Sequence, residues 1–237
     1  MKAHRFASVA ILVFAFSTVF EARESRSQEI KSKYPQMAPV EQYLMADRNA
    51  EIALARSAAP ESISHDATVL ILGRYGYETA VEGKNGFVCL VERGWMSPAD
   101  APEFWNPKIR GPICFNPPAA RSILPTTYKR TEMVLAGRTM AEIIDGNKAA
   151  FERGQLPALE PGAMSYMMSK QAYLTDHDDH NLAHLMFYTP PLDGTVWGAD
   201  MPKSPVMLNP QFKGAQPVDV FVVPVGRWSD GTSAPVM

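Results

Sequence analysis

Three of the five histidines of this 237-residue chain lie within eight positions, at His177, His180 and His184. Neutral imidazoles bind zinc, copper and nickel, and three protein ligands with an open fourth position form the usual catalytic zinc site. On a helix this spacing places all three rings on one face, whereas on an extended chain only His180 and His184 share a side. We therefore predict a metal or ligand site containing His180 and His184, with His177 more peripheral. Asp178 is a candidate ligand or a group that orients one of the rings.

A second interpretation of the same segment requires no metal. It is a solvated turn of aspartates and asparagine between two strands, with His184 hydrogen-bonded at the start of the second strand. Four methionines flank the segment, and thioethers beside imidazoles favour copper over zinc in an oxidising compartment. Methionine also fills irregular hydrophobic cores, which is the interpretation we favour for Met164, Met167, Met168 and Met186.

Other catalytic motifs are missing from the sequence. It contains no G-x-S-x-G elbow, no P-loop and no dinucleotide-binding glycine pattern. Two hypotheses follow. In the first, the protein binds a small molecule or a zinc or copper ion at His177–His184, with hydrolytic chemistry if it is an enzyme and with His180 or His184 as ligand or general base. In the second, it is a non-catalytic module without metal that contacts another envelope protein.

The chain has two cysteines, Cys89 and Cys114. An exported protein with an even number of cysteines usually pairs them, so we predict a disulfide that ties a proline-rich loop to a strand. A role for either thiol as a nucleophile is disfavoured, because an oxidising compartment would consume it.

The N-terminus indicates export. A basic start is followed by an apolar run at positions 7–20. A membrane-spanning helix needs roughly 20 apolar residues, so this run is short for one and is typical of a signal peptide. The small residues Ser25 and Ser27 favour cleavage after position 27, and an uncleaved anchor is the alternative. We therefore predict a signal peptide at 1–27, a mature protein at 28–237 without a membrane span, and a periplasmic or secreted location.

The charge balance excludes one class of partner. The whole chain has a formal charge of −2, and residues 1–27 hold four basic and two acidic residues, so the mature chain carries about −4. Nucleic-acid binding requires a basic surface, which this composition does not supply. The expected partners are a small molecule or another envelope protein.

Hydrophobic periodicity predicts the elements that must position these residues. We expect a helix at 39–57, a strand at Thr68–Leu72, and a β-hairpin of 77–81 and 87–92 around Asn85-Gly86. The proline-rich and aromatic stretch 94–118 is predicted to be a loop that either covers one face of the sheet or forms the wall of a pocket.

The second half of the chain is predicted in the same way. Two helices are expected at 119–136 and 139–154, the latter opened by a Thr139/Glu142 capping box. Strands are expected at 163–169, 185–189 and 218–225. Grouped helices favour an α+β fold: a single domain with a mainly antiparallel sheet of five or six strands, about three helices and long proline-rich loops.

Overall fold

One mixed sheet runs through the part of the protein that the structure describes. The computed structural model describes residues 33–98, 101–176, 181–209 and 217–235. Eight strands lie in the order β2-β1-β3-β4-β5-β6-β8-β7, and all pairs are antiparallel except β1 with β3. The strands are β1 (Thr68–Gly73), β2 (Gly76–Val81), β3 (Val88–Glu92), β4 (Gly111–Phe115), β5 (Met164–Met167), β6 (His184–Thr189), β7 (Met207–Asn209) and β8 (Asp219–Pro224).

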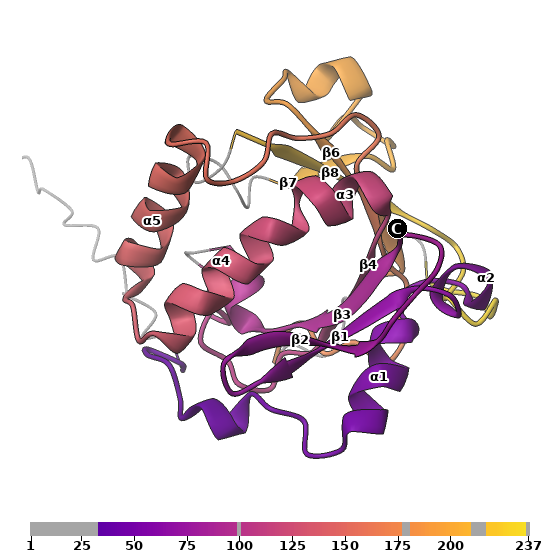
Figure 1. Ribbon diagram of the computed structural model, residues 1–237. Coiled ribbons are helices and arrows are strands. Elements are labelled where there is room, and N and C mark those ends of the chain that lie inside the picture. The colour runs from indigo at the N-terminus through magenta and orange to yellow at the C-terminus, as the bar shows by residue number, and fades with distance from the viewer. Residues whose placement is uncertain (1–32, 99–100, 177–180, 210–216, 236–237) are drawn as a thin grey trace, which may run out of the picture. The chain divides into compact units, whose positions relative to one another are not determined.

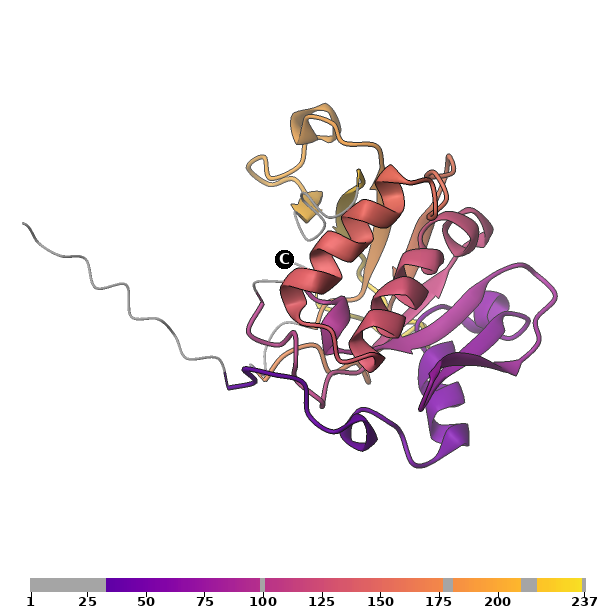
Figure 2. The ribbon, with the colours of Figure 1, turned by 60° about the vertical axis from the view of Figure 1, so that its left-hand side comes forward.

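Helices cover both faces of this sheet. The two short N-terminal helices pack on one face, and the three others lie on the opposite face, where α4 and α5 run side by side (Figures 1 and 2). None of the helices in the described ranges is long and apolar enough to cross a membrane. The helices are α1 (Arg48–Arg56), α2 (Glu61–Ser64), α3 (Pro117–Ser122), α4 (Leu124–Leu135) and α5 (Met140–Glu152), with 3-10 turns η1 (Val40–Gln42), η2 (Gly94–Met96) and η3 (Gly194–Trp197).

The mixed class of helices around a mainly antiparallel sheet is confirmed, but the sheet is larger than predicted. The sequence did not indicate β4, because Pro112 lies inside it, nor the three-residue β7. Proline is tolerated at this position for a geometric reason. The neighbouring pair Cys89–Cys114 has a Cα–Cα distance of 4.0 Å, which marks a pair without ladder hydrogen bonds. Val91–Pro112, two positions along, is therefore the same kind of pair, so the absent N–H of Pro112 costs no bond to β3.

The predicted hairpin around Asn85-Gly86 is wrong. Both strands exist, but β2 pairs with β1, and β3 lies parallel to β1 on its other side. Asn85 makes a local turn instead, because its side chain accepts from the amide of Phe87 at 3.0 Å and donates to the carbonyl of Ile63 at 2.7 Å. Just before this turn the chain passes the start of β1 so closely that a Cβ on Gly83 would lie 2.1 Å from the amide nitrogen of Thr68.

Helix boundaries follow their caps. The predicted helix at 39–57 begins only at Arg48, because Asp47 accepts from the amides of the first turn and fixes the start there. The capping box of Thr139 and Glu142 is confirmed. Gly146 does not break α5, and its missing side chain admits Met133 of α4, whose sulfur would lie 2.6 Å from an added Cβ.

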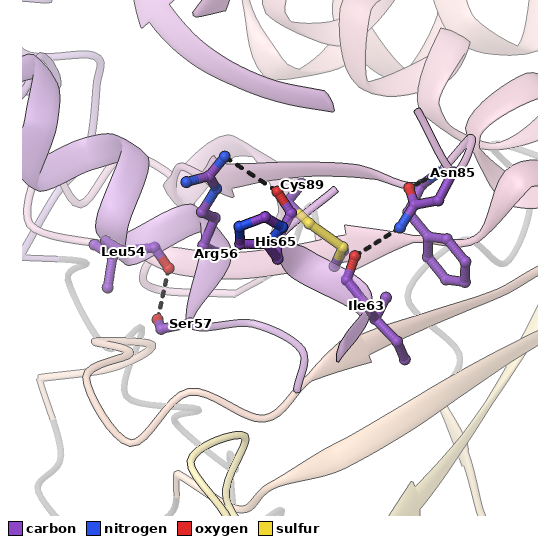
Figure 3. Close-up of a disulfide and its surroundings, with 9 residues drawn as sticks. Leu54, Arg56, Ser57, Ile63, His65, Asn85 and Cys89 are labelled. Atoms are coloured by element: carbon purple, nitrogen blue, oxygen red, sulfur yellow. Dashed lines mark hydrogen bonds between the residues drawn. A yellow bond between two sulfur atoms is a disulfide. The ribbon is translucent and has the colours of Figure 1, made fainter. Parts of the chain in front are cut away.

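The predicted disulfide is confirmed between Cys89 and Cys114 (Figure 3). It joins directly opposed residues of the central strands β3 and β4, so Cys114 lies in a strand and not in the predicted loop. Both residues are fully buried in the apolar layer beneath α1. The bond therefore ties together the middle of the sheet.

A buried ion pair connects α1 to the ends of β1 and β3. The guanidinium of Arg93 donates to Glu51 at 2.7 Å and to the carbonyl of Tyr43, also at 2.7 Å. A further N–H of Arg93 bonds to the carbonyl of Val91, and Glu51 accepts from the amide of Leu72 at 3.1 Å. The side chains of Arg93 and Glu51 are 0% and 2% exposed. Each buried charge therefore depends on the other and on these bonds.

We expect Glu51→Gln to lower the free energy of unfolding by about 3 kcal/mol, because it leaves the Arg93 cation buried without its counter-ion. Denaturant unfolding measures the loss. Glu41→Gln, which breaks the exposed pair with Arg74, is the matched control and should leave stability unchanged within error. Equal stability of the two variants would show that the buried pair does not hold α1 to the sheet.

Candidate functional site

A cavity of about 540 Å³ lies between the sheet and α4. Its floor is the face of β3, β4, β5, β6 and β8 that also packs on α3 and α4, with β7 beside it. Its walls are α4 and residues 96–98 and 101–109. Cavities of this size bind small molecules in many proteins, and such sites combine apolar walls with a few placed polar groups. The polar or ionisable residues on its lining are Glu92, Arg93, Ser97, Glu103, Thr126, Thr127, His184, Tyr188 and Asn209.

The strand register brings Glu92 and His184 onto the same floor. Glu92 follows Leu90 by two positions and lies opposite Gly111, while His184 lies opposite Met167. An added Cβ on Gly111 would be 3.6 Å from the Cβ of Glu92 and 3.5 Å from the Cε of Met167. Its nearest neighbour would be Cδ2 of Leu174 at 3.3 Å, so any side chain at position 111 would fill the floor between Glu92, Met167 and Leu174.

Glu92 is the most perturbed carboxyl group of this cavity. Burial raises its pKa to about 8, and the positive charge of Arg130 only partly opposes this effect. Its carboxyl accepts no hydrogen bond from any residue in the described ranges. A carboxyl group that is neutral at pH 7 can donate a hydrogen bond or a proton, and such perturbed groups in clefts are concentrated at functional sites.

His184 presents a free basic nitrogen. Its Nδ1 lies 2.7 Å from the carbonyl oxygen of Leu182. A carbonyl can only accept, so the proton of the neutral ring is on Nδ1. Burial lowers the pKa of His184 below its usual value and keeps the ring neutral. Nε2 forms no hydrogen bond to another residue of the described chain, which is the arrangement of a general base or of a metal-binding histidine held by a backbone carbonyl.

Thr126 adds an unsatisfied hydroxyl to the wall. It lies on α4, is 2% exposed, and its Oγ1 forms no hydrogen bond within the described structure. Leaving a buried hydroxyl unsatisfied costs about 1–3 kcal/mol, so a partner at this point is expected. Ser122, one turn earlier, donates its hydroxyl to the carbonyl of Pro118 at 2.8 Å. Helical serines commonly satisfy themselves in this way.

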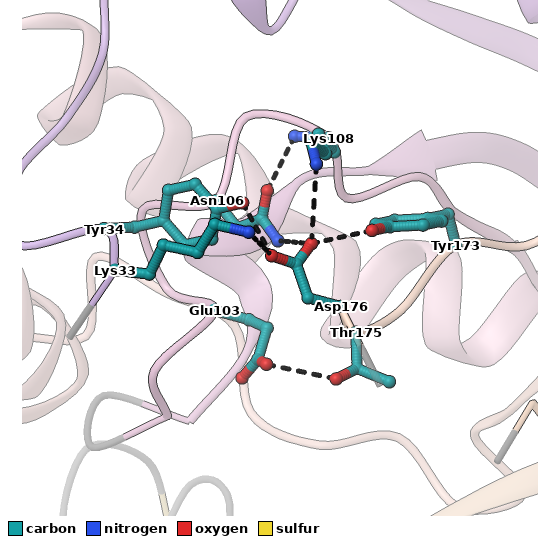
Figure 4. A network of polar contacts seen from close by, with 8 residues as sticks. All are labelled: Lys33, Tyr34, Glu103, Asn106, Lys108, Tyr173, Thr175 and Asp176. Atoms are coloured by element: carbon teal, nitrogen blue, oxygen red, sulfur yellow. Dashed lines mark hydrogen bonds and ion pairs between the residues drawn. The ribbon is translucent and has the colours of Figure 1, made fainter. Parts of the chain in front are cut away.

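Asp176 anchors one end of the histidine-rich segment (Figure 4). Its carboxylate accepts from Lys33 at 2.5 Å, Tyr173 at 2.6 Å and Tyr34 at 2.8 Å. Asn106 donates to it at 3.2 Å. These donors hold the pKa of Asp176 far below its usual range, whereas the carboxylate raises the pKa of Tyr173 to about 12. The network attaches the chain before position 177 to the loop that forms the cavity wall.

Of the residues that the sequence predicted for the site, the structure places only His184. His177, Asp178 and His180 lie outside the described residues, so their convergence stays a prediction. Within the described ranges, no three His, Cys, Asp or Glu side chains form a group that could hold a metal ion. Leu174 and Leu182, on either side of the histidine-rich segment, both line the cavity.

Described residues of the proline-rich segment contribute both to a buried core and to the cavity wall. Trp95, Phe104 and Trp105 are buried in a core with Tyr43 and do not line the cavity. The lining residues beside them are Met96, Ser97, Pro98, Ala101 and Glu103. Reasoning from the sequence missed Glu92 and Thr126. The signal for Glu92 was a charge at the end of an apolar strand, in phase with the inward Leu90.

A second depression of about 920 Å³ lies along α5 and residues 154–159. Its ionisable lining residues are Lys148 and Glu152, both exposed. We assign the candidate site to the smaller cavity, because buried polar groups converge there and not along this depression. Comparisons with protein-family models, with curated proteins and with solved structures find no match for this chain.

We expect Glu92→Gln to stabilise the protein at pH 8 by at least about 1 kcal/mol and to have little effect at pH 4. The folded state binds more protons than the unfolded state between the usual pKa of glutamate and about 8, so wild-type stability falls as pH rises through this window. Denaturant unfolding across this pH range is the measurement. Glu82→Gln, at an exposed position, is the control, and parallel pH curves for wild type and Glu92→Gln would contradict the prediction.

Proposed function

We propose that this is an exported protein that binds a small, mainly apolar molecule in the cavity between the sheet and α4. The observation that carries the proposal is that Glu92, His184 and Thr126 line one cavity. Oγ1 of Thr126 is buried without a partner in the described structure, and no described residue bonds to the carboxyl group of Glu92 or to Nε2 of His184. Unsatisfied polar groups inside a folded protein are costly, so they indicate the position of a ligand. Apolar side chains form most of the remaining lining and supply the binding energy.

A hydrolytic or other acid–base reaction is compatible with the same groups. Glu92 is a neutral acid near pH 7 and His184 is a neutral base with a free Nε2, which is the pairing that general acid–base catalysis requires. Substrate would lie along the floor between them. The sequence-based alternative, a non-catalytic module that contacts another envelope protein, gives these groups no role.

A zinc or copper site is the second candidate. His184 has the orientation of a metal ligand, with Nδ1 held by a carbonyl and Nε2 free. His180 and His177 would supply further imidazoles, with Asp178 as ligand or orienting group. A metal at this position would face the cavity and could polarise a bound carbonyl or lower the pKa of a bound water.

Export is the proposed context for either candidate. A disulfide in the central strands suits an oxidising compartment, and it agrees with the signal-like segment at 1–27. The mature protein would act in the periplasm or outside the cell.

The neutral fluorophore N-phenyl-1-naphthylamine tests the cavity, because its emission rises in apolar sites. We expect saturable binding to the wild type and a loss of about tenfold or more in affinity for Gly111→Val, whose methyl groups fill the floor between Glu92 and Met167. Gly73→Val makes the same change in β1 outside the cavity and is the control. Equal binding by all three proteins would contradict the proposed site.

Protein recovered from its native host tests export and metal content in one sample. Intact mass should show the loss of about 22–27 residues, as the cleavage rule predicts. Metal analysis without chelators should find about one zinc or copper per chain if the second candidate is correct, and His184→Ala should lower that content. A full-length chain in the cytoplasm would refute export, and a metal-free sample would refute the metal site.

A further inference from the structure

We infer that the ligand of this cavity is an apolar molecule that carries a primary ammonium group, which pairs with Glu92 and Thr126. The inference rests on the proposed function and specifies its ligand class. It follows from two inventories of the described lining, one of charges and one of hydrogen-bonding groups.

The charges of the lining favour a cation. Its carboxyl groups are Glu92 and Glu103, and its one lysine or arginine in the described ranges is Arg93. The charge of Arg93 is already matched by Glu51, and its N–H groups donate to Glu51, Tyr43 and Val91. Glu103 accepts from Thr175 at 3.1 Å. An anionic ligand would thus meet two acids and no available cation on the described lining, whereas a cation would meet its counter-ion.

Several hydrogen-bonding groups of the lining can accept a bond from a ligand. When an ammonium group binds, Glu92 releases its proton to solvent and the resulting carboxylate offers two acceptor oxygens. Nε2 of His184 is a further acceptor on the lining because the proton of the ring lies on Nδ1. Thr126 is 2% exposed and its hydroxyl is unsatisfied, so it can accept one further bond. A primary ammonium group brings three donors and no acceptor, so it can donate to the carboxylate of Glu92 and to the hydroxyl of Thr126. An alcohol brings one donor, and a carboxylate brings none.

Arg130 is the competing cation for Glu92. Its charge acts on the carboxyl group, but one of its terminal nitrogens, NH1, donates to the carbonyl of Trp95 at 3.1 Å behind the wall. Arg130 is not part of the cavity lining, so it does not occupy the space beside Glu92. The apolar body of the ligand would lie on Met167, Met186 and Met207, whose flexible thioethers adapt to different shapes.

Three probes with the same eight-carbon chain test this inference: octylammonium, 1-octanol and octanoate. Calorimetry at pH 7 should show octylammonium binding about tenfold or more tightly than octanol, as expected for a charge-assisted hydrogen bond in a desolvated site, with octanoate weakest. Glu92→Gln keeps the shape and removes the charge. It should bring the affinities for octylammonium and octanol close together while binding of octanol persists.

The outcomes distinguish failure of the ammonium ligand class from failure of the proposed small-molecule site. Octanol or octanoate binding as tightly as octylammonium would overturn the ammonium class and leave the small-molecule cavity standing. An unchanged preference in Glu92→Gln would overturn the role of Glu92. Failure of all three probes to bind the wild type would overturn the proposed function, and the inference with it. Gly111→Val, which fills the cavity, should weaken all three probes together, and unweakened binding by it would place the probes elsewhere and overturn the inference.

Discussion

The buried pair of Glu51 and Arg93 is the interaction on which the arrangement of this protein depends. Arg93 directly follows β3, and its bonds fix the direction in which that strand ends. Because side chains alternate along a strand, holding the guanidinium of Arg93 toward α1 directs the side chain of Glu92 to the opposite face, although both residues border the cavity. An ion pair on one side of the sheet thus positions an isolated acid on the other.

The same neighbourhood shows how burial can serve two purposes. Arg93 and Glu51 are both hidden from water, and they are tolerated because they pair with each other and with nearby backbone groups. The carboxyl group of Glu92 lies in similar low-dielectric surroundings but makes no such bonds, so burial raises its pKa. Glu51 on α1 is a satisfied acid with a structural role, whereas Glu92 at the end of β3 is an unsatisfied acid and is available to the proposed ligand.

Local patterns in the sequence were sufficient for some of these features and insufficient for others. The Thr139/Glu142 cap and most strands depend on residues close together in the sequence, and they were predictable. The disulfide was predictable because the chain has an even number of cysteines. The pairing of β1 with β3 was not, because an Asn-Gly turn is compatible with more than one partner strand. Glu92 and Thr126 come from separate elements and meet only through the packing of α4 on the sheet, which no periodicity encodes. His184 was found because it lies within a conspicuous cluster, and its Nδ1 bond was anticipated only as a hydrogen bond at a strand start.

The strand order affects the order in which the parts of this protein can fold. The floor of the cavity joins β3, near the start of the folded chain, to β8, near its end, and its strands span Glu92 to Pro224. A chain that emerges from its N-terminus can form β1 to β4 early, since those strands are close in sequence. The residues that complete the floor are synthesised last. The cavity floor is therefore completed only at the final stage of folding, so binding of the proposed ligand would report that the whole chain has assembled.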